Sequence, residues 1–208
     1  MYKSNYVARL SFIPLSLLSS TQHPCCNPLA TSTTMASTSK KEITDHLKTL
    51  YSSYRDTTDI DAKGLFFSTE CMQICRPNPS YAATNRETIV RYVREASEGG
   101  VGGESLGAKE GRTARPLRDD EFGFGTDEAV TAPVGLTITE LKEKARKEGW
   151  VGLRVDLWFY DEEQPEKDGL LVKVQYWWRK EGDEWFQILH DIMYMGPLDG
   201  TQGTEGDE

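Results

Sequence analysis

His190 is the residue whose type and position best suit chemistry in this sequence. It lies in a strand-like run, Trp185–Tyr194, on the more apolar of its two faces. That face consists of Phe186, Ile188, His190, Ile192 and Tyr194. A histidine in such surroundings is either a core residue whose ring bonds to the backbone, or the acid, base or donor of a pocket. In a pocket we expect its ring to titrate close to the ordinary pKa of about 6.5.

Two further side chains are candidates to act with His190. Apolar residues at helical spacing predict a helix that begins near Ser39, and Tyr54 closes its inward stripe. Asp61 follows where this helix leads into the next one. A histidine, a tyrosine and a carboxylate that face one cavity can move a proton beside a carbonyl group, as isomerases and dehydratases require. The candidate catalytic residues are therefore His190, Tyr54 and Asp61, with a core aromatic and a helix cap as the alternatives for the last two.

No motif in the sequence indicates a metal or a cofactor. Cys71 and Cys75 are spaced as C-x3-C, which lacks the paired spacing of a zinc site, and we interpret them as small reduced residues in or near the core. The sequence has no HExxH motif, no P-loop, and no G-x-G-x-x-G after a strand. We therefore predict no metal site and no cofactor.

Helices dominate the first part of the predicted structure. Capping boxes of the form S/T-x-x-E predict three helix starts, at Ser39–Glu42, Thr84–Glu87 and Thr137–Glu140. A short helix is expected near Thr58–Phe67, and the run Glu70–Arg76 predicts a strand that ends before two prolines.

Strands dominate the last part. Three runs, Val151–Tyr160, Leu170–Arg179 and Trp185–Tyr194, are separated by turn signals at 168–169 and 182–183. Alternation in the first two predicts a sheet that is packed on one face. Shorter strands are expected at 113–118 and 122–124. Helices followed by an antiparallel meander predict the α+β class.

The final strands also carry a family resemblance. The run from Val155 to Pro197, with V-D-L-W-F-Y-D, L-L-V-K-V-Q-Y-W-W-R and W-F-Q-I-L-H-D-I-M-Y-M, resembles the closing strands of nuclear transport factor two-like (SnoaL-like) proteins, in particular a fungal branch. Trp185, Ile188 and His190 match the type of residues there, with one extra residue that is compatible with a bulge. The resemblance spans residues 40–197. It implies a curved antiparallel sheet wrapped around N-terminal helices, which forms a cone with one open-ended pocket.

The resemblance implies a ligand pocket, and it does not imply one reaction, because this fold carries several chemistries. The side chains expected to line the pocket are Tyr51, Phe66, Tyr176, Trp178 and Ile188. We expect a small apolar or polyketide-like molecule there. The alternatives are an isomerase, dehydratase or cyclase of fungal secondary metabolism that uses general acid–base catalysis, and a non-catalytic dimerisation module whose own side chains fill the cone.

The opposite face of the predicted sheet carries large apolar side chains, which are Trp158, Tyr160, Trp177, Leu189 and Met193. A monomer rarely leaves a cluster of this size in water. We therefore predict a homodimer that forms through this face of the sheet.

Charge and composition bound the other partners. The chain has 33 acidic and 24 basic residues, and its formal net charge is −9. An acidic protein repels phosphate backbones and anionic lipid surfaces, so we expect no nucleic acid and no membrane as partners.

The ends of the chain lack periodic apolar patterns. Residues 1–38 are predicted to be a disordered leader; the alternative is a mis-assigned start, with Met35 as the true first residue. The domain is expected to span 39–197 with a flexible loop at 98–111, and residues 198–208 are expected to form a disordered acidic tail. We expect a cytoplasmic protein, with a mitochondrial location as the alternative because the leader is rich in Ser and Thr and has no acidic residue.

Overall fold

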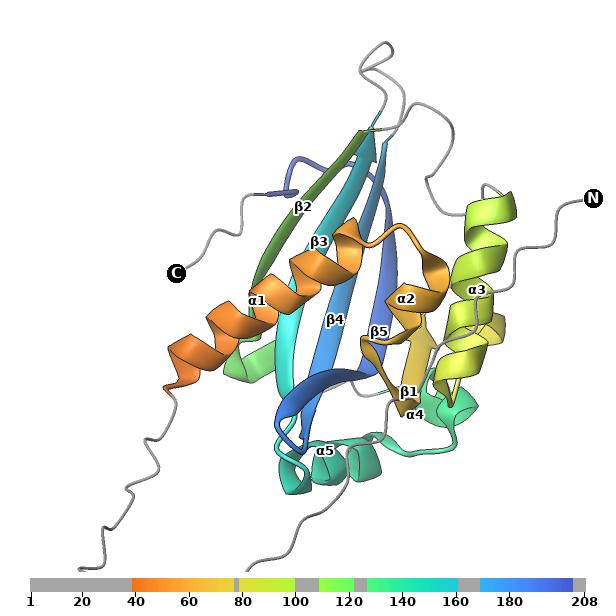
Figure 1. The fold of residues 1–208 in the computed structure, drawn as a ribbon. Coiled ribbons are helices and arrows are strands. Elements are labelled where there is room, and N and C mark those ends of the chain that lie inside the picture. Colours follow the sequence, from red (N-terminus) through yellow and green to blue (C-terminus); the bar gives the residue numbers. More distant parts are fainter. Residues whose placement is uncertain (1–38, 77–78, 100–108, 122–126, 161–168, 204–208) are drawn as a thin grey trace, which may run out of the picture. The chain divides into compact units, whose positions relative to one another are not determined.

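The computed structural model describes residues 39–76, 79–99, 109–121, 127–160 and 169–203 (Figure 1). The helices are α1 (Lys40–Asp56), α2 (Ile60–Gly64), α3 (Arg86–Gly99), α4 (Glu128–Thr131) and α5 (Ile138–Lys147). The strands are β1 (Phe67–Cys75), β2 (Lys109–Pro116), β3 (Val151–Tyr160), β4 (Leu170–Glu181) and β5 (Glu184–Pro197). Short 3-10 turns occupy Pro79–Tyr81, Asp119–Glu121 and Ala132–Val134. The predicted α+β class is confirmed. The predicted leader, most of the predicted loop and the strand at 122–124 lie outside the described residues.

The helices begin where local capping chemistry places them. The boxes at Ser39 and Thr137 are both closed, with each side chain accepting from the backbone of the glutamate three residues on. The third helix starts one residue later than predicted, because the Oδ1 atom of Asn85 accepts from the Thr88 amide at 2.9 Å, so Asn85 caps the helix in place of Thr84. None of the described helices is long and apolar enough to cross a membrane.

The five strands form one mixed sheet in the order β1-β5-β4-β3-β2. The strands from β2 to β5 pair antiparallel, as the meander predicted, whereas β1 pairs parallel to β5. The strict antiparallel sheet expected from the sequence is therefore correct for four of these strands. A parallel pair needs a long connection, and most of the domain lies between β1 and β5.

One face of the sheet packs against α1 and α3 (Figure 1). The predicted inward residues of β3 and β4 do lie in this core, from Leu153 to Leu157 and from Val172 to Trp178. Leu47, Tyr51 and Tyr54 supply the buried stripe of α1. Alternation in the sequence thus predicted the faces of these two strands correctly.

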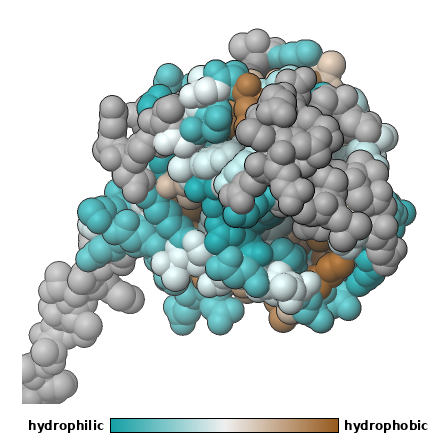
Figure 2. All heavy atoms as spheres, turned by 90° about the horizontal axis from the view of Figure 1, so that it is seen from above, coloured by the Kyte–Doolittle hydropathy of each residue, from teal (hydrophilic) through white to brown (hydrophobic). Residues whose placement is uncertain are grey.

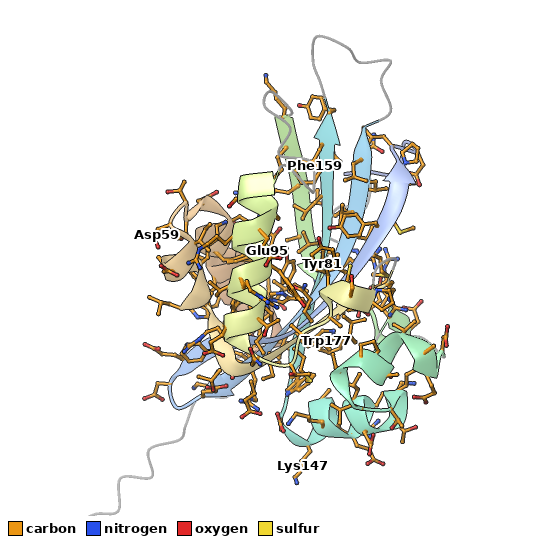
Figure 3. All side chains as sticks on the ribbon, turned by 90° about the vertical axis from the view of Figure 1, so that its right-hand side faces the viewer. Asp59, Tyr81, Glu95, Lys147, Phe159 and Trp177 are labelled. Carbon is orange, nitrogen blue, oxygen red and sulfur yellow. The ribbon has the colours of Figure 1, made fainter. Side chains whose placement is uncertain are left out.

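The other face of the sheet is covered by a second core. Figure 3 shows α3 and α5 on opposite sides of the sheet, with Trp177 on the side of α5. Buried members of this core are Met72, Ile74, Val134, Ile138, Leu141, Ala145, Trp150, Trp177, Ile188 and Leu189. Trp177 and Leu189 are 0% exposed within a single chain, so they cannot form the predicted dimer face. The sequence prediction was wrong for Trp177 and Leu189 because it did not foresee that α5 packs on this face of the sheet and covers them.

The rest of the predicted dimer face is partly covered by its own chain. Trp158 stacks over Gly111 of β2, where any side chain would collide with the indole ring. Gly203 lies beside the same ring, so part of the predicted acidic tail returns to the sheet. Trp158, Tyr160 and Met193 are half-buried. A homodimer remains a prediction, and it would have to use a smaller surface.

A β-bulge in β5 changes the direction of its side chains. Trp177 pairs with Leu189 and Trp178 pairs with Gln187, so Ile188 is the extra residue. Trp185, which precedes the bulge, therefore faces the α1 side of the sheet. His190 and Ile192, which follow the bulge, face the same side. Strict alternation had placed Ile188 on the same face as His190, which the bulge makes wrong.

The second core predicts the effect of mutations in α5. Leu141 is fully buried there, and truncation to Ala should lower the free energy of unfolding by about 2–5 kcal/mol because it leaves a cavity. Glu143→Ala, on the exposed side of the same helix, should change it by less than about 0.5 kcal/mol. Urea denaturation of the two variants measures this, and equal effects would mean that α5 does not cover the sheet.

Candidate functional site

A cavity opens between the sheet and the helices α1 and α3. Its volume is about 160 Å³. Its apolar wall is formed by Ile89, Val93, Leu157, Phe159, Val172, Val174 and Ile192. Its polar side chains are Tyr54, Arg55, Gln73, Tyr176, His190 and Tyr194. We call this cavity the inner chamber. An apolar space with a few polar groups is the usual form of a small-molecule site.

A wider cavity of about 510 Å³ adjoins the inner chamber. The two share Tyr54, Arg55, Val93 and Phe159, which therefore lie between the cavities, and we call these four side chains the neck. We call the wider cavity the vestibule, and its remaining wall comes from residues between Thr57 and Lys63 and from the last turns of α3. Figure 2 views this end of the domain, where the described surface is largely hydrophilic with small hydrophobic patches.

His190 lies deep in the inner chamber and is 3% exposed. Its Nε2 atom is 2.5 Å from the Oε1 atom of Gln187, which precedes the bulge on the same strand. The rings of Phe67 and Tyr176 contact the imidazole edge-on, at 5.1 and 5.0 Å between centroids. Because the Gln187 oxygen accepts a hydrogen bond, Nε2 carries the proton and Nδ1 is an acceptor. Nδ1 has no protein partner among the described residues.

Burial keeps His190 uncharged. Loss of solvation lowers the pKa of His190 to about 3. The sequence prediction that it would titrate near its ordinary value is therefore wrong for this structure. The ring lines a cavity, as predicted, and at neutral pH it is a hydrogen-bonding group without charge.

Tyr51, Tyr54 and Tyr176 form an aromatic cluster above His190. The ring of Tyr176 is 5.1 Å from that of Tyr51 and 6.1 Å from that of Tyr54. Burial raises the pKa of each phenol above its ordinary value, so all three remain protonated and can donate. Tyr51 packs behind the chamber wall, and its hydroxyl has no hydrogen-bond partner among the described atoms.

Arg55 is the charged residue of the neck, and the sequence analysis missed it. Its guanidinium pairs with Glu110 of β2. Burial lowers the pKa of Arg55, but the phenolic groups of Tyr176, Tyr51 and Tyr54 and the Glu110 carboxylate raise it more, so the net shift is upward. The sequence did contain a signal for Arg55, because this residue follows the inward-facing Tyr51 by one helical turn and therefore lies on the same side of α1.

The remaining predicted site residues lie in different places. Asp61 points to solvent with 82% of its side chain exposed and pairs with Arg94 at 2.7 Å, so it is not a catalytic partner of His190. Phe66 packs edge-on against Tyr54 at 5.9 Å, outside the chamber lining. Trp178 is part of the core on the α1 side but does not line the chamber. Ile188 faces the second core because of the bulge. Tyr54 and Tyr176 do meet His190 at the chamber.

Within the described parts of the chain, no three His, Cys, Asp or Glu residues lie close enough together to hold a metal ion. Cys71 is the sulfur nearest to the site, with its Sγ atom 4.0 Å from the Nε2 atom of His190. Burial raises the pKa of the Cys71 thiol well above its ordinary value, which makes it a poor nucleophile.

The neutral histidine predicts a pH dependence of stability. The folded pKa of about 3 lies below the unfolded value of about 6.5, so only the unfolded chain takes up this proton as the pH falls. This contribution is present above pH 6.5 and is lost progressively toward pH 3. Between pH 7 and pH 5 the wild type should lose about 2 kcal/mol more than His190→Gln. Urea denaturation at both pH values measures the difference, and an NMR titration that places this ring near pH 6.5 would contradict the neutral assignment.

Comparison with solved structures finds distant likenesses. A ketosteroid isomerase-like protein from Erwinia carotovora atroseptica is 9% identical, covers 74% of this chain and 95% of its own, and has a TM-score of 0.44. An NTF2-like protein of unknown function from Pseudomonas putida is 8% identical, and the match covers 80% of this chain and 93% of that protein with a TM-score of 0.47. ActVI-ORFA from Streptomyces coelicolor is 9% identical, and the match covers 74% of this chain and 96% of that protein with a TM-score of 0.45.

Sequence comparison identifies the family. A search of curated proteins found no match to this chain. The family model for the SnoaL-like domain matches residues 36–208, which includes every element described above. This confirms the resemblance seen in the last strands, while the fungal branch remains a prediction. The chain belongs to the SnoaL-like domain family.

Proposed function

We propose that this protein binds one small, largely apolar molecule in the inner chamber. The observation that supports this most directly is an apolar space that ends on His190, whose Nδ1 atom has no protein partner among the described residues. A polar atom left without a partner in a buried site is costly unless water or a ligand satisfies it. A ligand that carries a hydroxyl group could donate to Nδ1.

The dimensions favour a ring compound. The inner chamber has a volume of about 160 Å³, and an apolar protein cavity of about 150 Å³ is known to accommodate benzene. Aliphatic side chains such as Val172 and Val174 line the space on the sheet side. The vestibule offers room for the rest of a larger molecule. A compound with fused or linked rings, such as a polyketide-like molecule, has the matching shape.

Binding is better supported than acid–base catalysis. A general base works best when its pKa lies near the working pH, and the pKa of His190 is lowered to about 3. The described lining of the chamber also contains no carboxylate, since Asp61 lies at the surface. The isomerase, dehydratase or cyclase alternative therefore lacks the second group that it needs. The non-catalytic module is less well supported, because the cone is not filled by its own side chains.

Native mass spectrometry tests the proposal directly. The purified protein would be sprayed alone and with neutral two-ring compounds such as naphthalene and 2-naphthylmethanol. We expect a bound species of one ligand per chain, and a higher melting temperature in the presence of the ligand. Failure of every ring compound to bind at millimolar concentration would overturn the proposal.

Narrowing the neck should abolish binding while the fold persists. Val93 lines both cavities from α3, so the indole of Val93→Trp should occupy the space that a ligand needs. We expect at least about a tenfold loss of affinity, because steric exclusion removes most of the apolar contact. Glu95→Trp adds the same side chain to the same helix at an exposed position and serves as the control. Isothermal calorimetry with 2-naphthylmethanol compares the two, and equal affinities would place the ligand elsewhere.

A further inference from the structure

The charged side chains among the described residues that line the two cavities are basic, in a protein that is acidic overall. The chain carries a formal net charge of −9. Among the described residues that line the vestibule, Arg55 and Lys63 are the charged ones, and there is no carboxylate. The Nζ atom of Lys63 lies 5.1 Å from the ring centre of Tyr54, so both cations lie at the neck. A local excess of positive charge attracts an anion and opposes a cation.

The neck also has hydrogen-bond donors that the protein does not use. The Nε–H group of Arg55 is buried and has no acceptor. The hydroxyl of Tyr51 behind the wall has none either. Such groups are costly in a folded protein when they remain unpaired. A guanidinium has five N–H donors, so Arg55 keeps donors for a carboxylate beside the one that Glu110 uses.

Glu110 already uses one nitrogen of the Arg55 guanidinium. Glu110 bonds to the Nη2 atom of Arg55 and also lies 3.7 Å from Arg112. Arg112 in turn pairs with Asp56 at 2.7 Å. Glu110 is thus shared between the two arginines, whereas Asp56 pairs with Arg112. The Glu110 carboxylate offsets part of the positive charge of Arg55.

We propose that the ligand is an apolar carboxylic acid, whose carboxylate is held at the neck by Arg55 while its apolar body lies in the inner chamber. This assignment rests on the proposed function and adds the chemical class of the ligand. Lys63 contributes charge at the vestibule side, and the tyrosine hydroxyls supply neutral donors nearby. The acid enters as its anion, since a carboxyl group of ordinary pKa is ionised at pH 7.

Three probes of one shape test the class of ligand. They are 2-naphthoate, 2-naphthylmethanol and 2-naphthylmethylammonium, which carry a negative, a neutral and a positive head on the same rings. We expect the wild type to bind 2-naphthoate at least about tenfold more tightly than the alcohol, because charge-assisted bonds to arginine are the stronger ones. The ammonium compound should bind most weakly. Calorimetry at pH 7 and low salt measures all three.

Matched variants locate the preference at Arg55. Arg55→Met keeps the length of the side chain and should lower the affinity for 2-naphthoate by about tenfold, while the affinity for the alcohol stays within about twofold. Arg91→Met removes an exposed arginine that pairs with Glu95 and lines neither cavity, and should leave both affinities unchanged. Glu110→Gln removes the competing carboxylate and should raise the affinity for 2-naphthoate.

The outcomes separate the two proposals. If none of the probes binds, the proposed function itself fails. If the alcohol binds as tightly as 2-naphthoate, or if Arg55→Met weakens both equally, the carboxylate assignment is overturned and small-molecule binding stands. Circular dichroism checks the fold of each variant. Should Arg55→Met not fold, Lys63→Met and Glu110→Gln decide the matter, because they must shift the affinity for 2-naphthoate downward and upward, respectively.

Discussion

The β-bulge between Gln187 and Leu189 determines the direction of the side chains from Leu189 to Tyr194 in β5, and the inner chamber depends on that direction. If the same residues formed a regular strand without the bulge, a strand that directs Trp185 to the α1 side would direct His190 to the opposite face. With it, Trp185 and Gln187 before the bulge and His190 after it share the α1 side. The bulge also places the side chains of two successive residues, Ile188 and Leu189, on the side of α5. The bulge thus directs His190 into the chamber and directs Ile188 and Leu189 into the second core.

The second core explains how an open chamber is compatible with a stable domain. Trp150, Trp177 and Leu141 are almost completely buried on the far side of the sheet. Burial of large apolar side chains is the main favourable term in folding. Because much of it is obtained between the sheet and α5, the space between β3, β4 and α3 does not have to be filled. The pairing of Trp158 with Gly111 and Gly203 shields another part of the same face.

Burial also selects the chemistry that the chamber can perform. It lowers the pKa of His190 and raises the pKa of Tyr54 and Tyr176, so all three are neutral near pH 7. Neutral groups orient a ligand through hydrogen bonds, whereas efficient proton transfer needs groups that titrate near the working pH. Arg55 retains its charge at the neck because Glu110 and the phenols support it. A site with uncharged groups inside and cations at its entrance suits recognition of an apolar body that carries an anionic head.

The sequence by itself determined the α+β class, two of the capping boxes, and the faces of β3 and β4, because hydrophobic period and caps are local properties. It also identified His190 and Tyr54 as residues that face one pocket. It could not place Ile188, because a bulge arises from the pairing of β5 with β4 rather than from β5 alone. It could not exclude Trp177 and Leu189 from the surface, since α5 covers them from a different part of the chain. Arg55 became a candidate only when folding brought Glu110 and Tyr176 beside it, because contacts of that sequence separation are decided by the tertiary structure.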